Sequence, residues 1–328
     1  MSIFAQDLTI YCPHFSWSVN SLSVLIPSHN PRLPLLIQVL EALRHQTLAS
    51  EQWELLLIDN ASDPPLSSDL LNWHYQARLV REPALGLTQA RLRGIVEASG
   101  EVLVWVDDDN VLDPGYLEAA VEAFRANPRL GAAGGPSIAC YAEPPPSWFV
   151  EGLVPLGCRD HGDQPVLMSW RDQSPHYPPV APIGAGLVIR RRAIQLWAHQ
   201  VRSDGRRRAF GRRGQALSSG EDNDINLTLL AHGWELAYLP QLRLSHHIPA
   251  ARLREAYQQR LARASFRDFV QVLDLHGIRP WRPIAGWTLP LRSLRAWFTY
   301  RAWRGPAERI LWQGAVGQFK GRAALVRP

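Results

Sequence analysis

The chain has 328 residues, of which 46% are hydrophobic and 20% charged, a composition that excludes a fibrous repeat or an intrinsically disordered chain. Its formal net charge is +5, its pI is about 9.4, and arginine carries nearly all of the positive charge. Three cysteines, Cys12, Cys140 and Cys158, are too few and too scattered for a disulfide framework or a zinc site.

The first residues lack the basic start and the apolar run of a signal peptide. No window reaches the roughly 18 apolar residues of a membrane-spanning helix. We therefore expect a cytoplasmic protein, with peripheral contact at the inner face of a membrane left open. Residues 1–20 show no clear period and are expected to form an N-terminal extension.

Buried strands and amphipathic helices alternate along the first half of the chain. Apolar runs predict strands at 22–26, 55–58 and 101–106. Helical spacing predicts helices at 33–46 and at 87–98, the second closed by Gly100, and Asp113 with Pro114 is expected to start a third. This order predicts an α/β fold: a mostly parallel, Rossmann-like central sheet with helices on both faces.

The second half of the chain is less regular. Residues 141–182 are rich in Pro, Trp and Gly and are expected to form loops over the sheet. Strands are predicted at 187–190, 234–239 and 242–246, and a helix at 221–232. Beyond Ala250 the pattern is helical and rich in Trp and Arg, so we expect a catalytic domain at 21–250 followed by a C-terminal helical region at 251–328.

Three acidic side chains, Asp107, Asp108 and Asp109, directly follow the predicted strand 101–106. Ligands of parallel sheets bind beyond the carboxyl ends of the strands, where 27–30 and 59–62 should also lie. Adjacent carboxylates repel one another unless a cation compensates. In an extended segment Asp107 and Asp109 would share a side, which suits Mg²⁺ or Mn²⁺ held together with substrate phosphates.

An alternative is that the triplet caps the next helix, but Asp113 is expected to fill that position. A kinase or phosphatase with strand-end aspartates stays open at this point. A second acidic cluster, at 218–224, has two interpretations. Ser219 could be the N-cap of a helix with acids in its first turn, or a carboxylate could act as a general base toward an acceptor hydroxyl.

With both clusters in order, the chain resembles the inverting glycosyltransferases of family 2, which have the GT-A fold. The resemblance covers roughly residues 22–250. The segments that carry it are VLIPSHN (24–30), LLLIDNAS (55–62), GLTQARLRGIVEASGEVLVWVDDDN (86–110), IGAGLVIRR (183–191), GEDNDINLTLLAHGWELAYLP (220–240) and SHHIP (245–249).

The resemblance implies roles for individual residues. The nucleotide site would be lined by Pro27, His29, Asn30 and Asp59. Arg91 would lie toward the nucleotide sugar, with Asp107 and Asp108 on the nucleotide and ribose side. A metal, Mn²⁺ or Mg²⁺, would be held by Asp109, Asp107 and His246. Asp222 would be the catalytic base, with Asp224 as a rival.

The implied reaction moves one sugar from a nucleoside-diphosphate-sugar donor to a hydroxyl of a saccharide or lipid-linked acceptor, with inversion, in surface polysaccharide or glycolipid assembly. The Gln-x-x-Arg-Trp motif of processive synthases is absent after Ala250, which favours single addition. One alternative is a nucleotidyltransferase of related fold, whose glycine-rich signature is missing between Leu22 and Arg44. The other is a non-catalytic carbohydrate-binding protein, against which the two acidic clusters argue.

Two arginine-rich segments stand apart from these motifs. Residues 203–214 are expected to form either a mobile lid over the diphosphate, with Arg207 and Arg208 affecting donor KM, or a solvated loop. Residues 281–304 interleave Trp, Phe and Tyr with Arg, as in a segment at a membrane interface or a helical cap on the catalytic domain. No nucleic-acid-binding motif is visible, and we expect no nucleic-acid partner.

Overall fold

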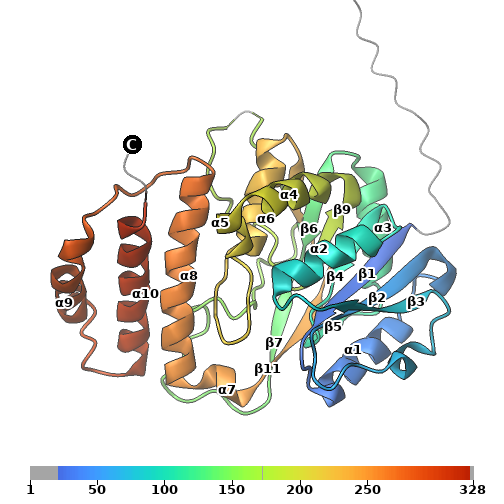
Figure 1. The fold of residues 1–328 in the computed structure, drawn as a ribbon, viewed down its shortest axis with the longest axis horizontal. Helices are drawn as coiled ribbons and strands as arrows, with labels where there is room; N and C mark the ends of the chain where they lie inside the picture. The colour runs from blue at the N-terminus through green and yellow to red at the C-terminus, as the bar shows by residue number, and fades with distance from the viewer. Residues whose placement is uncertain (1–20, 172, 326–328) are drawn as a thin grey trace, which may run out of the picture.

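The computed structural model describes residues 21–171 and 173–325, and within them a sheet of eight strands forms the core of the α/β part (Figure 1). From edge to edge its strands are β3 (Ala77–Glu82), β2 (Trp53–Asn60), β1 (Leu22–Ser28), β4 (Val102–Trp105), β9 (Leu187–Arg190), β6 (Leu130–Gly134), β10 (Glu235–Tyr238) and β8 (Val166–Met168). Strands β1 to β4 are parallel, as are β6 and β10, whereas β9 and β8 run antiparallel to their neighbours. The predicted α/β fold with a mostly parallel sheet and helices on both faces is confirmed. The expected extension at 1–20 lies outside the described residues.

Helices cover both faces of this sheet. Buried hydrophobic side chains form one cluster on each face. The first cluster includes side chains of α1 (Leu33–Arg44) and α3 (Tyr116–Ala126), and the second includes side chains of α2 (Leu87–Glu97), α4 (Arg191–Ser203) and α6 (Glu221–Ala231). Successive residues of β1 divide between the two, since Val24 belongs to the first cluster and Leu25 to the second. With both faces buried, the central strands are continuous apolar runs rather than alternating ones.

A second, three-stranded sheet lies beside the carboxyl edge. Its middle strand is β11 (Leu244–Ile248), which pairs with β5 (Asn110–Leu112) on one side and β7 (Ser137–Tyr141) on the other. In this register His246 lies opposite Asn110, the residue that follows the acidic triplet. The small sheet thus brings the chain around residue 246 to the edge where the triplet lies.

The C-terminal part of the chain is helical, as expected. It consists of α7 (Ala250–Leu253), α8 (Glu255–Leu275), α9 (Leu289–Thr299) and α10 (Pro306–Ala323). The short helix α5 (Gly205–Arg208) lies earlier in the chain, between α4 and α6. Helix α10 packs closely on α8. The helices are so close that a Cβ on Gly317 would lie only 2.3 Å from the carbonyl oxygen of Arg263. Helix α9 packs on α10 and lies at the far end of the molecule from the sheet (Figure 1). Short 3₁₀ turns occur at η1 (Ser50–Gln52), η2 (Ser68–Leu71) and η3 (Gly286–Thr288).

No helix among the described residues combines the length and the apolar character that crossing a bilayer requires.

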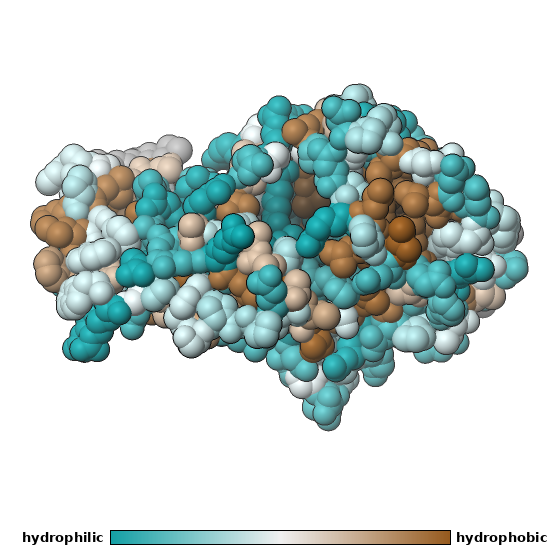
Figure 2. All heavy atoms as spheres, turned by 90° about the horizontal axis from the view of Figure 1, so that it is seen from below, coloured by the Kyte–Doolittle hydropathy of each residue, from teal (hydrophilic) through white to brown (hydrophobic). Residues whose placement is uncertain are grey.

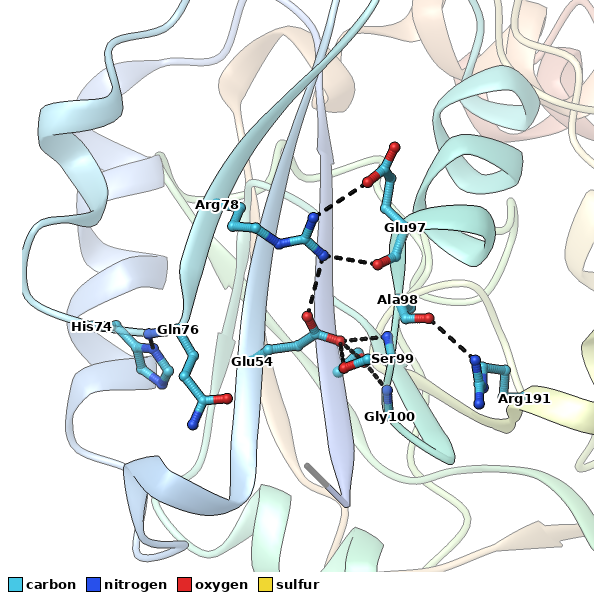
Figure 3. Close-up of polar contacts among 10 residues, drawn as sticks. Glu54, His74, Gln76, Arg78, Glu97, Ala98, Ser99, Gly100 and Arg191 are labelled. Carbon is cyan, nitrogen blue, oxygen red and sulfur yellow. Dashed lines mark hydrogen bonds and ion pairs between the residues drawn. The ribbon is translucent and has the colours of Figure 1, made fainter. Parts of the chain in front are cut away.

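The buried carboxylate of Glu54 ties together the amino-terminal edge of the sheet (Figure 3). Its Oε1 accepts hydrogen bonds from Ser23 Oγ at 2.6 Å and from the Ser99 backbone N at 2.6 Å. Its Oε2 lies 3.3 Å from Arg78 Nη2, and Arg78 also pairs with Glu97. Burial raises the pKa of Glu54, but the hydrogen bonds outweigh it and the net pKa is lowered.

Two predictions about helix ends are wrong. Helix α3 begins at Tyr116 with Gly115 as N-cap, so Asp113 does not cap it; the Asp113 carboxylate instead pairs with Arg243 at 3.9 Å, and its backbone N donates to the Arg243 carbonyl. Helix α2 ends at Glu97 with Ala98 as C-cap. Gly100 is instead needed for close approach, since a Cβ there would lie 2.6 Å from the backbone of Leu22 and Ser23.

Candidate active site

A cavity of about 420 Å³ opens at the carboxyl edge of the sheet. Its walls come from the ends of β1 and β4, the start of α2, the start of α6, and the loops around 155–158, 183–185 and 210–220. The predicted site residues that border it are Pro27, His29, Arg91, Asp107, Asp108, Asp109, Asp222 and His246. Segments far apart in the sequence therefore meet at one cavity.

The acidic triplet forms a turn rather than an extended segment. The backbone N of Asn110 donates to the Asp107 carbonyl at 3.0 Å, so the expected alternation of sides does not apply and all three carboxylates border the cavity. Asp108 accepts a hydrogen bond from Ser28 Oγ at 2.6 Å. Asp109 lies 3.0 Å from Arg252 Nη2 and 3.4 Å from His246 Nε2.

These partners and burial give the three carboxylates different pKa values. Burial raises the pKa of Asp108 to about 7, and the neighbouring Asp109 and Asp107 add to the rise. Burial acts the same way on Asp109, but its hydrogen bond to His246 and the charge of Arg252 lower its pKa to about 2. Burial also raises the pKa of Asp107, with Arg91 opposing. Asp109 is thus the triplet's most stably ionised member.

The donor set fits a hard divalent cation only in part. Among the described residues, no group of three or more His, Cys, Asp or Glu side chains is arranged to hold a metal ion. Mg²⁺, however, is commonly held by one or two carboxylates together with substrate phosphates. Asp109 and Asp107 meet that requirement at the cavity wall, whereas Arg252 offsets part of the negative charge of Asp109.

The side chains expected at the nucleotide divide into two groups. Pro27 and His29 border the cavity, and His29 Nδ1 lies 2.8 Å from the Asn60 carbonyl. Asn30 and Asp59 do not border it. Asp59 is buried, bonded to the backbone N of Ser62 at 3.0 Å and paired with Arg81. Asn30 accepts from the Asp63 backbone N at 2.9 Å, so both order the loop after β2.

Arg91 links the two acidic clusters. Its Nη1 lies 2.8 Å from Glu221 Oε1, and its Nη2 lies 3.9 Å from Asp107 Oδ1. The guanidinium also stacks over the ring of Trp105, 4.5 Å from the ring centroid. Thr88 donates to the same Glu221 carboxylate. The start of α6 is therefore joined through Arg91 to the end of β4.

Asp222 and Asp224 lie in different surroundings. Asp222 borders the cavity and accepts a hydrogen bond from the Gly184 backbone N at 3.1 Å. Asp224 is buried away from the cavity, where Trp197 Nε1 lies 2.9 Å and His276 Nε2 2.7 Å from its carboxylate. The first interpretation of the second cluster, a Ser219 cap, does not hold: Gly220 is the N-cap residue of α6, and the backbone N of Ser219 donates to Asp268.

The arginine-rich segment 203–214 is not a free lid. It contains the end of α4 and the short helix α5. Arg207 pairs with the buried Asp224, and Arg208 donates to the carbonyls of Val201 and Arg202. Arg212 alone among its arginines borders the cavity. Arg207 and Arg208 are therefore bound to residues away from the cavity, which argues against the lid interpretation, and helix α5 departs from a simple solvated loop.

Several residues at the cavity were not predicted. Arg252 follows the SHHIP segment, and Cys158 Sγ lies 3.7 Å from His246 Nδ1. Cys158 and Cys140 are free cysteines, while Cys12 lies outside the described residues. Asn60 borders the cavity and accepts from the Gly86 backbone N at 2.8 Å, which sets the turn before α2. Asn60 lies within the LLLIDNAS segment, just after a predicted strand, so the sequence could have indicated that it borders the site.

Comparison with known protein families gives two overlapping matches. The family described as "Glycosyl transferase family 2" matches residues 23–151. The family described as "Glycosyl transferase family group 2" matches residues 102–303, which is more than half of the chain. Together the two matches include the acidic triplet, Asp222 and His246.

Curated proteins also show similarity. The O-antigen biosynthesis protein RfbC of Myxococcus xanthus is 27% identical over 267 residues, covering 76% of this chain and 19% of that protein. The uncharacterized glycosyltransferase YwdF of Bacillus subtilis is 30% identical over 98 residues, 30% of this chain and 35% of that protein. The glucosyl-dolichyl phosphate glucuronosyltransferase of Haloferax volcanii is 30% identical over 78 residues, 24% of this chain and 25% of that protein.

The chain spans at most 35% of the length of these three relatives. Their similarity and the family matches agree with the α/β fold and the cavity at the carboxyl edge. The chain belongs to the family 2 glycosyltransferases.

Proposed function

We propose that this glycosyltransferase moves a single sugar from a nucleoside-diphosphate-sugar donor to a hydroxyl of its acceptor, with inversion at the anomeric carbon. The observation that supports this most is the junction at Arg91. One buried guanidinium contacts Glu221, next to Asp222, and also approaches Asp107 of the triplet. A carboxylate suited to a general base and carboxylates suited to a cation–diphosphate pair thus share one cavity.

In the proposed reaction Asp222 is the catalytic base. It accepts the proton of the acceptor hydroxyl as that oxygen bonds to the anomeric carbon. The bond from the anomeric carbon to the diphosphate oxygen breaks, and its electron pair leaves with the nucleoside diphosphate. The Gly184 backbone N, 3.1 Å from Asp222 Oδ2, orients this carboxylate. Asp224, committed to Arg207, His276 and Trp197, is not proposed as the base.

The leaving diphosphate needs positive charge. Asp109 and Asp107 would hold Mn²⁺ or Mg²⁺, which when bound stabilises the departing diphosphate as a Lewis acid. His246 is proposed to support Asp109, 3.4 Å away, since its Nε2 faces that carboxylate. Arg212 and Arg252, which border the same cavity, add fixed positive charge toward the phosphates.

The nucleoside is proposed to lie against Pro27 and His29, with Asp108 on the ribose side. Asn30 and Asp59 act from behind by holding the loop after β2. The acceptor is proposed to be a saccharide or lipid-linked saccharide used in surface polysaccharide or glycolipid assembly, at the cytoplasmic face of a membrane. Support comes from RfbC, named for O-antigen biosynthesis, and from the Haloferax relative, named for glucosyl-dolichyl phosphate.

The donor is tested first. The protein is heated with a panel of nucleoside diphosphates, each with and without Mn²⁺. We expect one nucleotide to raise Tm in a Mn²⁺-dependent manner, and Asp109→Ala to abolish the shift. No shift with any nucleotide contradicts the proposed donor site.

The base is tested next with Asp222→Asn, which keeps the shape and loses the proton acceptor. Transfer kcat from the identified donor should fall about 10²–10⁴-fold while the nucleotide-induced Tm shift is kept. Asp163→Asn, at an exposed aspartate, is the matched control and should leave kcat unchanged. A kcat for Asp222→Asn within a few-fold of wild type would rule out this base.

A further inference from the structure

The C-terminal segment 287–303 concentrates exposed apolar surface. Six of the fifteen exposed large apolar side chains among the described residues lie in it. They are Trp287, Leu291, Leu294, Phe298, Tyr300 and Trp303. Trp287 is 83% exposed and Leu291 71%. Such a contiguous patch on a folded protein marks an interaction surface, whereas single exposed side chains do not.

Three of these side chains share one face of α9. Leu291, Leu294 and Phe298 are spaced three and four residues apart, which places them in one stripe along the helix. The opposite face is already used. Ala296 is buried, and Trp297 packs edge-on against Trp312 of α10 with ring centroids 4.8 Å apart. Trp312 Nε1 also donates to the Ser293 carbonyl at 3.0 Å. The apolar stripe therefore faces outward because α10 fixes the inner face.

The position of this stripe is at the end of the molecule away from the sheet. Helix α9 is the outermost helix there (Figure 1). Hydrophobic side chains gather at the same end in the space-filling view (Figure 2). An extended flat surface can therefore contact α9 at this end of the molecule without contacting the central sheet.

The charged side chains of the segment that carries the stripe are all of one sign. From Leu275 to Ala307 the sequence has no Asp or Glu, but it has six arginines, which are Arg279, Arg282, Arg292, Arg295, Arg301 and Arg304. Within the described part of the chain, ion pairs are found for Arg279, with Asp274, but not for the four arginines from 292 to 304. The stripe is thus apolar with an unneutralised cationic border.

We propose that this face of α9, with Trp287 and Trp303 at its ends, docks on the surface of an anionic lipid bilayer. Trp side chains favour the membrane–water interface, where their apolar body is buried and their N–H stays hydrated. Leu291, Leu294 and Phe298 enter the acyl boundary, and the arginines contact lipid phosphates. A second copy of this chain fits less well, because it would bring two cationic borders together.

Binding is measured by flotation of the full-length protein with vesicles of phosphatidylcholine alone or mixed with phosphatidylglycerol. We expect the protein to float with the anionic vesicles at low salt and to be released as salt increases. The triple variant Trp287→Ser/Leu291→Ser/Phe298→Ser should lose at least about tenfold in partitioning. Arg295→Gln/Arg301→Gln/Arg304→Gln should lose the preference for anionic over neutral vesicles.

The matched control is Leu33→Ser/Ile37→Ser, which removes two exposed apolar side chains from α1. It should bind vesicles like the wild type, and all variants should keep the wild-type unfolding midpoint. Wild-type protein that stays with the unfloated fraction, or an equal loss in the α1 control, overturns the proposal. The proposal is also overturned if the protein does not bind vesicles but self-associates in a way that the triple variant loses. It is likewise overturned if the protein binds RNA and not vesicles.

Flotation uses neither donor nor acceptor, so its outcome is independent of the proposed transfer reaction.

Discussion

Arg91 and Glu221 form an ion pair in which Nη1 lies 2.8 Å from Oε1 and only 3% and 4% of the two side chains are exposed. The pair joins α2 to the first residue of α6. Because both charges are withdrawn from water, each depends on the other for compensation. The relationship therefore has consequences for stability as well as for the placement of Asp222.

Arg91→Met should be strongly destabilising, since it leaves Glu221 buried without its partner. We expect a loss of about 3–5 kcal/mol in the free energy of unfolding, measured by urea denaturation. Arg93→Met is the matched control. Arg93 lies two residues after Arg91 on the same helix, and its ion pair with Glu97 is partly exposed. The control should cost less than about 1 kcal/mol. Similar losses for the two variants would contradict the assigned role of the buried pair.

Arg252→Gln should make Mn²⁺ bind more tightly to the nucleotide-free protein. Arg252 lies 3.0 Å from Asp109 and offsets its negative charge, so its removal should raise Mn²⁺ affinity about tenfold. Water-proton relaxation during a Mn²⁺ titration measures this directly. Arg254→Gln, at an exposed arginine two residues on, should not change the titration. Weaker or unchanged Mn²⁺ binding by Arg252→Gln would show that Asp109 does not contribute to the cation site.

Glu54→Gln should destabilise the protein in a pH-dependent manner. The hydrogen bonds of Glu54 hold its pKa below the ordinary value of 4.5, so the ionised side chain stabilises the fold above that pH. This contribution is lost as the pH falls through the lowered pKa of the folded state. At pH 7 the variant should lose about 1.5–3 kcal/mol in urea denaturation, and the difference should shrink below pH 4. A difference that stays constant with pH would contradict this account.

Gly100→Ala should destabilise the sheet, because the added Cβ would lie 2.6 Å from the backbone of β1. Backbone atoms cannot move aside as a flexible side chain can, and we expect a loss of about 1–3 kcal/mol. Gly286→Ala meets no atom within 4 Å and should change stability by less than about 0.5 kcal/mol. Thermal unfolding of both variants tests the pair. Equal Tm values would show that Gly100 is not needed for this contact.

Much of the central sheet could be predicted because its strands are buried on both faces. Such strands are short apolar runs that stand out from their flanks, as at 22–26 and 55–58. The edge strand β3 was not predicted, since in ARLVRE only Val80 is buried and the pattern carries little signal. The five residues of β6 were also missed, because LGAAG is small and glycine-containing.

Some residues of the candidate site could likewise be predicted from the sequence, and others could not. The triplet directly follows a predicted strand, and its place at the carboxyl edge follows from the order of strands. Arg252 could not be found from local pattern, because it reaches Asp109 only through the pairing of β11 with β5. The Asp113 cap failed for a related reason: the Asp113 carboxylate pairs with Arg243, beside β11, and the helix starts later. In both cases a contact between residues far apart in the sequence decides where the side chain lies.

The β5–β11 pairing also bears on how the protein is made. The triplet leaves the ribosome well before His246 and Arg252, which give Asp109 its counter-charges. Likewise Arg91 is synthesised long before Glu221. A nascent chain that ends before β11 therefore carries a set of acidic side chains that its own later residues have not yet neutralised. Because non-local contacts form slowly, we expect the site to be assembled late in folding, and a chain truncated before residue 252 would lack the arginine that pairs with Asp109.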